Sequence, residues 1–196
     1  MYGGLLGRFR KNIENKTINE FISILPNGIT VLDCPCGNGR WFKTISSVAK
    51  KIIALDVSVG MTNYAKNRVI SSEIVVLLGD AEKIDLDDAS VDYVFSYALM
   101  KHVPHHIQIN ILKEFNRVSK NGVICSFPIF NKLSYWYWKR SDISESYPMF
   151  QKDIEQLARH AGMKIVKQKK ISQPILGLEH LLQFEPVDKE IINEFS

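Results

Sequence analysis

One acid and two glycines stand between a strand-like run and a helix-like run near the start of the chain. Asp33 follows the apolar run 29–32, and Gly37 and Gly39 precede the helical run 42–49. Glycine lets the backbone turn tightly and approach a ligand that a Cβ would keep away. A helix that starts after the turn presents unpaired N–H groups to the same ligand. A strand, a Gly-x-Gly turn and a helix together indicate a site for a nucleotide-type cofactor.

Two more acids follow the next strand-like runs. Asp56 lies about 20 residues beyond the turn, the spacing at which an acid binds ribose hydroxyls. Asp80 follows the run 74–78, and with the N–H of Ala81 it can pair with an adenine edge. The carboxyl ends of parallel strands meet at one edge of a sheet, where ligands of open α/β folds bind. Acids at three successive strand ends therefore predict one ligand site at that edge.

Alternating strands and helices must position these acids. The sequence predicts strands at 29–32, 51–57, 74–78, 91–97 and 123–127, with two last strands near 164–170 and 178–184. It predicts helices at 11–25, 42–49, 58–69, 104–118 and 150–161. This alternation is typical of an α/β fold with a parallel sheet and helices on both faces.

Local signals sharpen several of these elements. The unbroken Ile, Val and Leu of 74–78 predict a strand buried on both faces. Ser58 can cap the helix that follows it, and Met61, Tyr64, Ala65 and Val69 share one face of that helix. Pro104 stands at the first position of its helix, and Asn121-Gly122 is expected to turn the chain into the fifth strand.

Length and composition describe an ordinary globular domain. The 196 residues, 45% hydrophobic and 23% charged, predict one domain over 1–196. No apolar run approaches the roughly 20 residues that span a bilayer, and the N-terminus does not resemble a signal peptide. We therefore expect a cytoplasmic protein without a membrane partner, as a monomer or homodimer. The net charge of +4 is mild, and the lysines of 164–170 are explained as the exposed face of a strand, so a nucleic-acid partner is unlikely. Cys34 and Cys36 lack the second pair of ligands that a zinc site needs.

The segments that carry the acids and glycines resemble the class I S-adenosylmethionine-dependent methyltransferases. The resemblance rests on Val-Leu-Asp-Cys-Pro-Cys-Gly-Asn-Gly at 31–39, Leu-Asp-Val-Ser at 55–58 with Met61, Gly-Asp-Ala-Glu at 79–82, Asp-Tyr-Val-Phe-Ser at 92–96, and the segment 114–122. It covers roughly residues 28–185. It implies a Rossmann-like sheet of seven mostly parallel strands, the last of them antiparallel.

The resemblance also implies S-adenosylmethionine as the cofactor. It places Asp33, Gly37 and Gly39 at the methionine part. Further cofactor contacts are expected from Asp56 at the ribose, Asp80 and Ala81 at the adenine with Met61 beside it, and from Cys36, Val57 and Tyr97.

One position departs from the family pattern. Pro35 stands where the first motif usually has glycine, and proline has no N–H to donate to a ligand. The rival class, a nicotinamide-dependent dehydrogenase, needs a third glycine where this chain has Phe42. The charged Asp33 also suits the methyltransferase pattern better.

The segment 97–106 is expected to face the transferred methyl group. His102 is the candidate general base, because the ordinary pKa of histidine is close to neutrality, although a helix-capping role explains it equally well. With His105 and His106 it could instead form a metal site, but no carboxylate accompanies them. The Asn/Asp-Pro-Pro-aromatic motif of base-amine methyltransferases is replaced by Phe-Ser-Tyr-Ala at 95–98.

Two segments can form an acceptor pocket. They are the N-terminal cap 1–27, with Tyr2 and Arg8, and an aromatic insertion at 130–148, with Tyr135 and Trp136. Tyr97, His102 and His106 complete the expected acceptor contacts. Aromatic and arginine side chains suit a small aromatic or anionic acceptor. The sequence thus favours methylation of a small molecule on oxygen; an RNA or protein methyltransferase and a non-catalytic cofactor-binding module are the alternatives.

Overall fold

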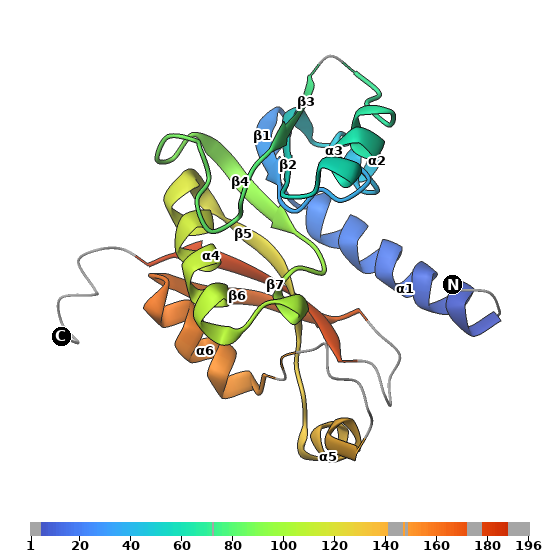
Figure 1. Ribbon diagram of the computed structural model, residues 1–196, viewed down its shortest axis with the longest axis vertical. Helices are drawn as coiled ribbons and strands as arrows, with labels where there is room; N and C mark the ends of the chain where they lie inside the picture. The colour runs from blue at the N-terminus through green and yellow to red at the C-terminus, as the bar shows by residue number, and fades with distance from the viewer. Residues whose placement is uncertain (1–4, 72, 141–146, 148, 172–177, 188–196) are drawn as a thin grey trace.

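The computed structural model describes residues 5–71, 73–140, 147, 149–171 and 178–187, without the side chains of residues 5, 6 and 137. The described strands are β1 (Ile29–Asp33), β2 (Ala49–Asp56), β3 (Ile74–Leu78), β4 (Val91–Ser96), β5 (Ser119–Pro128), β6 (Met163–Lys170) and β7 (Glu179–Pro186). They form one sheet in the order β3-β2-β1-β4-β5-β7-β6 (Figure 1).

The sheet confirms the predicted topology. β1 pairs in parallel with β2 and β4, and β7 lies between β5 and β6 and is antiparallel to both. The chain moves outward from β1 to β2 and β3, and then crosses back to β4 on the other side of β1. Strand order therefore reverses between β1 and β4, which places the ligand crevice of an open α/β sheet at their carboxyl ends.

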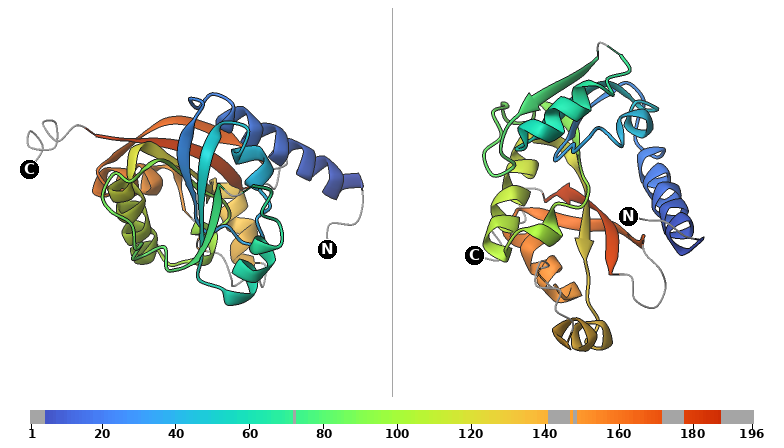
Figure 2. Two further views of the ribbon diagram at one scale, coloured as in Figure 1. Left: turned by 90° about the horizontal axis from the view of Figure 1, so that it is seen from above. Right: turned by 45° about the vertical axis from the view of Figure 1, so that its right-hand side comes forward.

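Helices cover both faces of the sheet. The described helices are α1 (Leu5–Ile22), α2 (Phe42–Ile45), α3 (Val59–Lys66), α4 (His105–Val118), α5 (Lys132–Arg140), α6 (Gln151–His160) and the short 3-10 helix η1 (Met100–His102). One buried core joins α4 and α6 to the sheet, and the other joins α1 and α2. These two groups of helices lie on opposite sides of the sheet (Figure 2). Adjacent strand residues such as Val31 and Leu32 enter opposite cores, because successive strand side chains point to opposite faces.

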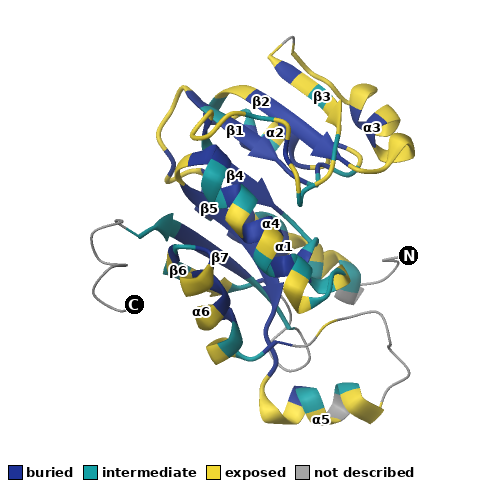
Figure 3. Cartoon of the chain, turned by 60° about the vertical axis from the view of Figure 1, so that its left-hand side comes forward, coloured by how far each residue is buried: buried dark blue, intermediate teal, exposed yellow. Residues whose placement is uncertain are grey.

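The prediction that 74–78 is buried on both faces is wrong. β3 is an edge strand, and Val75, Leu77 and Leu78 are exposed (Figure 3). The connection 79–90 to β4 forms no helix, so the side of β3 that carries Val75 and Leu77 stays uncovered. An apolar run reports the residue types of a strand but not its place in the sheet.

Other elements differ from their predicted bounds or faces. On α3 the buried residues are Thr62 and Ala65, whereas Met61 and Tyr64 are exposed, because this short helix covers only the sheet edge. Part of the aromatic insertion forms α5, which stands off the sheet beyond β5 (Figure 1). Pro104 is the N-cap of α4 and not its first residue. Gly122 lies inside β5 and not in a turn.

Candidate functional site

The turn after β1 is fixed by backbone hydrogen bonds to both neighbouring strands. The N–H of Cys34 donates to the carbonyl of Phe95 on β4, and the N–H of Cys36 donates to that of Leu55 on β2, both at 2.9 Å. Gly37 has a φ of +52°, which favours glycine, and a Cβ there would meet no atom within 4 Å. The turn thus offers bare backbone to an open space at the strand ends.

Gly39 has a second reason to be glycine. Its φ is +75°, and a Cβ would lie 2.6 Å from the ring of Phe42. That ring is buried at the start of α2. The glycine therefore lets the turn pack directly on the helix that follows it.

Asp56 connects the end of β2 to this turn. Its Oδ2 accepts from the N–H of Gly37 at 2.8 Å, and its Oδ1 accepts from the N–H of Ser58 at 2.9 Å. Ser58 caps α3, as predicted, because its hydroxyl accepts from the N–H of Met61. Each carboxylate oxygen has a further lone pair, so Asp56 retains acceptor capacity for ligand hydroxyls while its orientation is fixed.

Asp33 is fully buried at the end of β1, and neither of its carboxyl oxygens has a hydrogen-bond partner among the described residues. Burial raises the pKa of Asp33 well above its usual range, and the nearby Asp56 raises it further. An unpaired buried carboxyl is costly. A buried polar group without a partner requires an explanation, and a donor supplied by a bound ligand would satisfy this carboxyl.

The two cysteines of the turn are also buried. Burial, followed by the charges of Asp33 and Asp56, raises the pKa of Cys36 to about 12 and disfavours a thiolate. Across the part of the chain that the structure describes, no three His, Cys, Asp or Glu side chains gather as metal ligands.

Asp80 and Ala81 begin the β3–β4 connection. Asp80 is exposed, and its Oδ1 accepts from the N–H of Glu82 at 2.9 Å. Val57 and Met61, after β2, and Leu78, at the end of β3, are exposed apolar side chains at the same edge of the sheet. The edge therefore carries polar and apolar groups together, as an adenine base requires.

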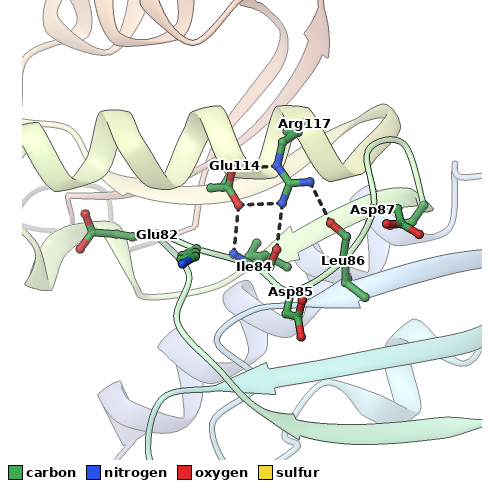
Figure 4. A pocket seen from close by; sticks show the side chains of 9 residues that line it. Glu82, Ile84, Asp85, Leu86, Asp87, Glu114 and Arg117 are labelled. Atoms are coloured by element: carbon green, nitrogen blue, oxygen red, sulfur yellow. Dashed lines mark hydrogen bonds and ion pairs between the residues drawn. The ribbon is translucent and has the colours of Figure 1, made fainter.

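Arg117 of α4 holds this connection in place (Figure 4). Its guanidinium donates to the carbonyls of Ile84 and Leu86 and to both oxygens of Glu114, each at 2.8 Å. Glu114 Oε2 also accepts from the N–H of Ile84 at 3.0 Å. The hydrogen bond from Arg117 lowers the pKa of Glu114, so the pair stays ionised. The sequence analysis assigned no role to this pair. The pair anchors to α4 a connection that contains no helix of its own.

The loop after β4 contains a strained residue. Ala98 has a φ of +65°, which is unfavourable for a residue with a Cβ. Its N–H donates at 2.8 Å to Ser126 of β5, whose hydroxyl donates at 2.9 Å to Glu179 of β7. Strain of this kind gathers at functional sites. Ser126 and Glu179 lie 28 and 81 residues beyond Ala98, so no local sequence signal could have identified them.

Tyr97 precedes Ala98 and stacks edge-on against Trp41 of the turn, with ring centroids 5.4 Å apart. His102 is exposed at the end of η1, and His106 is exposed in the first turn of α4. The buried Gln108 holds η1 by donating to the carbonyls of Met100 and Val103 at 2.7 and 3.1 Å. His102 is therefore presented on a fixed segment.

The predicted acceptor residues have different surroundings. Tyr2 lies outside the described residues. Arg8 lines a cavity together with Arg10 and Arg40. Tyr135 packs against Trp138 and Phe150, whereas Trp136 is exposed, with the Arg140 guanidinium 3.6 Å from its ring centroid.

A doubly wound α/β sheet with this turn and these acids defines a Rossmann-like fold with a candidate nucleotide-cofactor site. Comparison with known proteins is more specific. Residues 31–122 match the family model described as "Methyltransferase domain". The chain is 33% identical over 118 residues to a malonyl-[acyl-carrier protein] O-methyltransferase of Yersinia pestis, covering 59% of this chain and 43% of the relative. It is 30% identical over 127 residues to a demethylmenaquinone methyltransferase of Shouchella clausii, covering 58% and 53%.

Solved structures agree on the fold. Magnesium protoporphyrin IX methyltransferase from Synechocystis PCC 6803, with bound S-adenosylhomocysteine, superposes with a TM-score of 0.76 at 13% identity, over 93% of this chain and 88% of that one. The chain spans about half the length of the curated relatives it matches. The chain has the Rossmann-like fold of class I methyltransferases, and its residues 31–122 match a methyltransferase domain.

The residues present fit S-adenosylmethionine, the cofactor that the sequence resemblance implies. The unpaired Asp33 and the bare backbone at Gly37 suit its methionine part, Asp56 suits its ribose, and Asp80 with Ala81 suits its adenine.

Among the described residues no helix is long and apolar enough to cross a bilayer.

We expect Arg117→Met to weaken S-adenosylhomocysteine binding about tenfold, because the connection that carries Asp80 and Ala81 loses its anchor to α4. Lost hydrogen bonds to a charged group should also lower the free energy of unfolding by about 2 kcal/mol. Calorimetric titration gives the affinity, and hydrogen exchange at 80–89 gives the opening of the connection. Lys113→Met, an exposed change on the same helix, is the control. Unchanged exchange at 80–89 would contradict the anchoring role.

Proposed function

We propose that this protein transfers a methyl group from S-adenosylmethionine to an oxygen atom of a small-molecule acceptor. The main support is the match of residues 31–122 to a methyltransferase domain, together with the buried Asp33, which has no hydrogen-bond partner among the described residues. The names of both curated relatives state methyl transfer, and that of the Yersinia pestis protein states transfer to oxygen. The absence of a base-amine motif at 95–98 also favours a small acceptor.

When bound, S-adenosylmethionine supplies a methyl group already activated on a sulfonium, so the protein mainly aligns the acceptor with it. Asp33 and the turn orient the methionine part, and Asp56 orients the ribose. The loop 97–103 faces the acceptor, held by Ser126 through Ala98 and by Gln108. Tyr97, His106, Tyr135, Trp136 and Arg8, with Tyr2, are the proposed acceptor contacts, and they stay predictions, as do a cytoplasmic location and a monomeric or dimeric state.

The direct test is methyl transfer across a panel of small phenols, alcohols, carboxylic acids and amines, with S-adenosylhomocysteine formation as the readout. We expect turnover with at least one oxygen acceptor. Asp56→Ala serves as the background control, because it removes the carboxylate that holds the turn and the ribose. Binding of the cofactor without turnover on any acceptor, or turnover only on amines, would contradict the proposal.

His102 is the proposed general base. It accepts the proton of a hydroxyl acceptor as the new carbon–oxygen bond forms. We expect His102→Gln to lower kcat about a hundredfold, since positioned proton acceptors contribute about 10²–10⁴-fold, and to leave S-adenosylhomocysteine affinity unchanged. His160→Gln, at the end of α6, is the matched control. A change confined to the KM of the acceptor would mean that His102 only positions it.

A further inference from the structure

A basic groove lies between α1 and the turn–α2 segment. We use this name for the cavity of about 500 Å³ lined by Lys11, Asn15, Asn19, Asn38, Arg40, Trp41, Lys43, Thr44 and Arg68. Lys11, Asn15 and Asn19 are spaced at i, i+4 and i+8, and therefore share one face of α1. None of these lining residues, all of them in the described part of the chain, is acidic.

Three of the four cations that line the groove are not neutralised by the described residues, because Lys11, Lys43 and Arg68 make no ion pair there. The fourth, Arg40, pairs with Glu14 at 2.6 Å. The other carboxylate of α1, Glu20, pairs with lysines of β6. Like charges that share one cavity repel each other, and this repulsion is relieved when an anion enters.

The donors of the groove suit an anion with several oxygens. Arg68 is oriented by a contact of 3.4 Å to Asn38 Oδ1, and a guanidinium can donate two parallel hydrogen bonds to one phosphate. The side-chain amides of Asn15 and Asn19 add neutral donors. A volume of about 500 Å³ lies within the range of small-molecule sites and exceeds what one carboxylate fills.

The groove also leads to the strand ends. Arg40 forms the wall between it and a second cavity of about 340 Å³ that Arg8 lines. The Arg40 guanidinium lies 4.3 Å from the ring centroid of Trp41 and 5.9 Å from that of Tyr97. Glu14 fixes Arg40 in this position, with 12% of the Glu14 side chain exposed. Trp41 therefore links the groove, which it lines, to Tyr97 at the end of β4, whose ring it contacts edge-on.

We propose that the basic groove binds a phosphate or diphosphate group of the methyl acceptor. That the bound molecule is the methyl acceptor rests on the proposed function, whereas the groove as an anion site is supported by its own residues. It names the class of acceptor: a small molecule with a reactive oxygen at one end and a phosphate ester at the other.

Calorimetric titration with inorganic pyrophosphate at low ionic strength tests the groove. We expect saturable binding with a Kd of about 1 mM or below. Lys43→Gln combined with Arg68→Gln should weaken it at least about tenfold, because two of the charge-assisted contacts are lost. Lys113→Gln combined with Lys152→Gln removes the same charge from α4 and α6 and should leave the affinity unchanged. S-adenosylhomocysteine affinity should be the same in all three proteins.

Several other results would overturn the anion site or its assignment. Unsaturable pyrophosphate binding, or an equal loss in the control pair, would leave only a diffuse surface charge. Loss of S-adenosylhomocysteine affinity with Lys43 and Arg68 would assign the groove to the cofactor carboxylate. Displacement of pyrophosphate by single-stranded RNA at far lower concentration would assign it to nucleic acid. If wild type bound pyrophosphate but no S-adenosylhomocysteine, the proposed function would fail while the anion site stood.

Discussion

We expect Asp33→Asn to melt at a higher temperature than the wild type at pH 8 and to bind S-adenosylhomocysteine about a hundredfold more weakly. The free protein buries this carboxyl without a hydrogen-bond partner among the described residues. Replacing a buried unpaired acid by a neutral group of the same shape removes a desolvation cost. The same change removes the charge and one acceptor oxygen offered to the ligand.

The gain in stability of Asp33→Asn should depend on pH, because it depends on the ionisation of Asp33. Burial holds the pKa of Asp33 in the folded protein well above its usual value of about 3.9 in an unfolded chain. Between those two values the folded state binds more protons than the unfolded state, so the free energy of unfolding falls as pH rises. The advantage of Asp33→Asn should therefore be small near pH 4 and grow with pH, in melting curves from pH 4 to 8.

Asp85→Asn, at an exposed acid of the β3–β4 connection, is the matched control. It should follow the wild-type melting curve across the range. Parallel pH profiles for Asp33→Asn and the wild type would contradict the assignment of Asp33 as a buried acid awaiting a ligand.

Gly122→Ala should produce the largest loss of stability of any single change considered. Gly122 has a φ of +148°, and a Cβ there would lie 2.2 Å from the carbonyl oxygen of Phe184 on β7. Because the obstacle is backbone, β5 and β7 must separate. We expect the free energy of unfolding to fall by about 3–5 kcal/mol, which lowers Tm by roughly 6–20 °C for a chain of this length.

Gly28→Ala separates crowding from backbone strain. Gly28 also has a positive φ, +78°, but a Cβ there would meet nothing within 4 Å. Its cost should be limited to the left-handed conformation, about 1 kcal/mol. Chemical denaturation of the two variants measures both values, and equal losses would mean that β7 yields to the added methyl group.

The placement of the candidate cofactor residues at one edge of the sheet was largely predictable because its signals are local. Asp33, Gly37, Gly39 and Asp56 each follow a recognisable strand-like run, and the rule that parallel strands end at one edge brings them together. The fold followed from the same alternation. These inferences needed only residue type and spacing, which a single sequence contains in full.

The surroundings of the same residues could not be predicted. The sequence predicts a ribose contact for Asp56, but only the structure reveals that its oxygens also accept from Gly37 and Ser58. Likewise, exposure of β3 depends on its edge position and on a connection without a helix. Burial and pairing depend on which elements become neighbours, and periodicity does not encode that.

The sequence by itself indicated the fold class, the resemblance to methyltransferases and the acids at the strand ends, since these depend on short motifs in order. Tertiary structure decided that Asp33 has no partner among the described residues, that Arg117 anchors the β3–β4 connection and that Ser126 holds Ala98. It also placed Lys11 of α1 in one groove with Arg68, 57 positions later in the chain. Such contacts join residues far apart in sequence, and folding alone brings their charges and hydrogen bonds together.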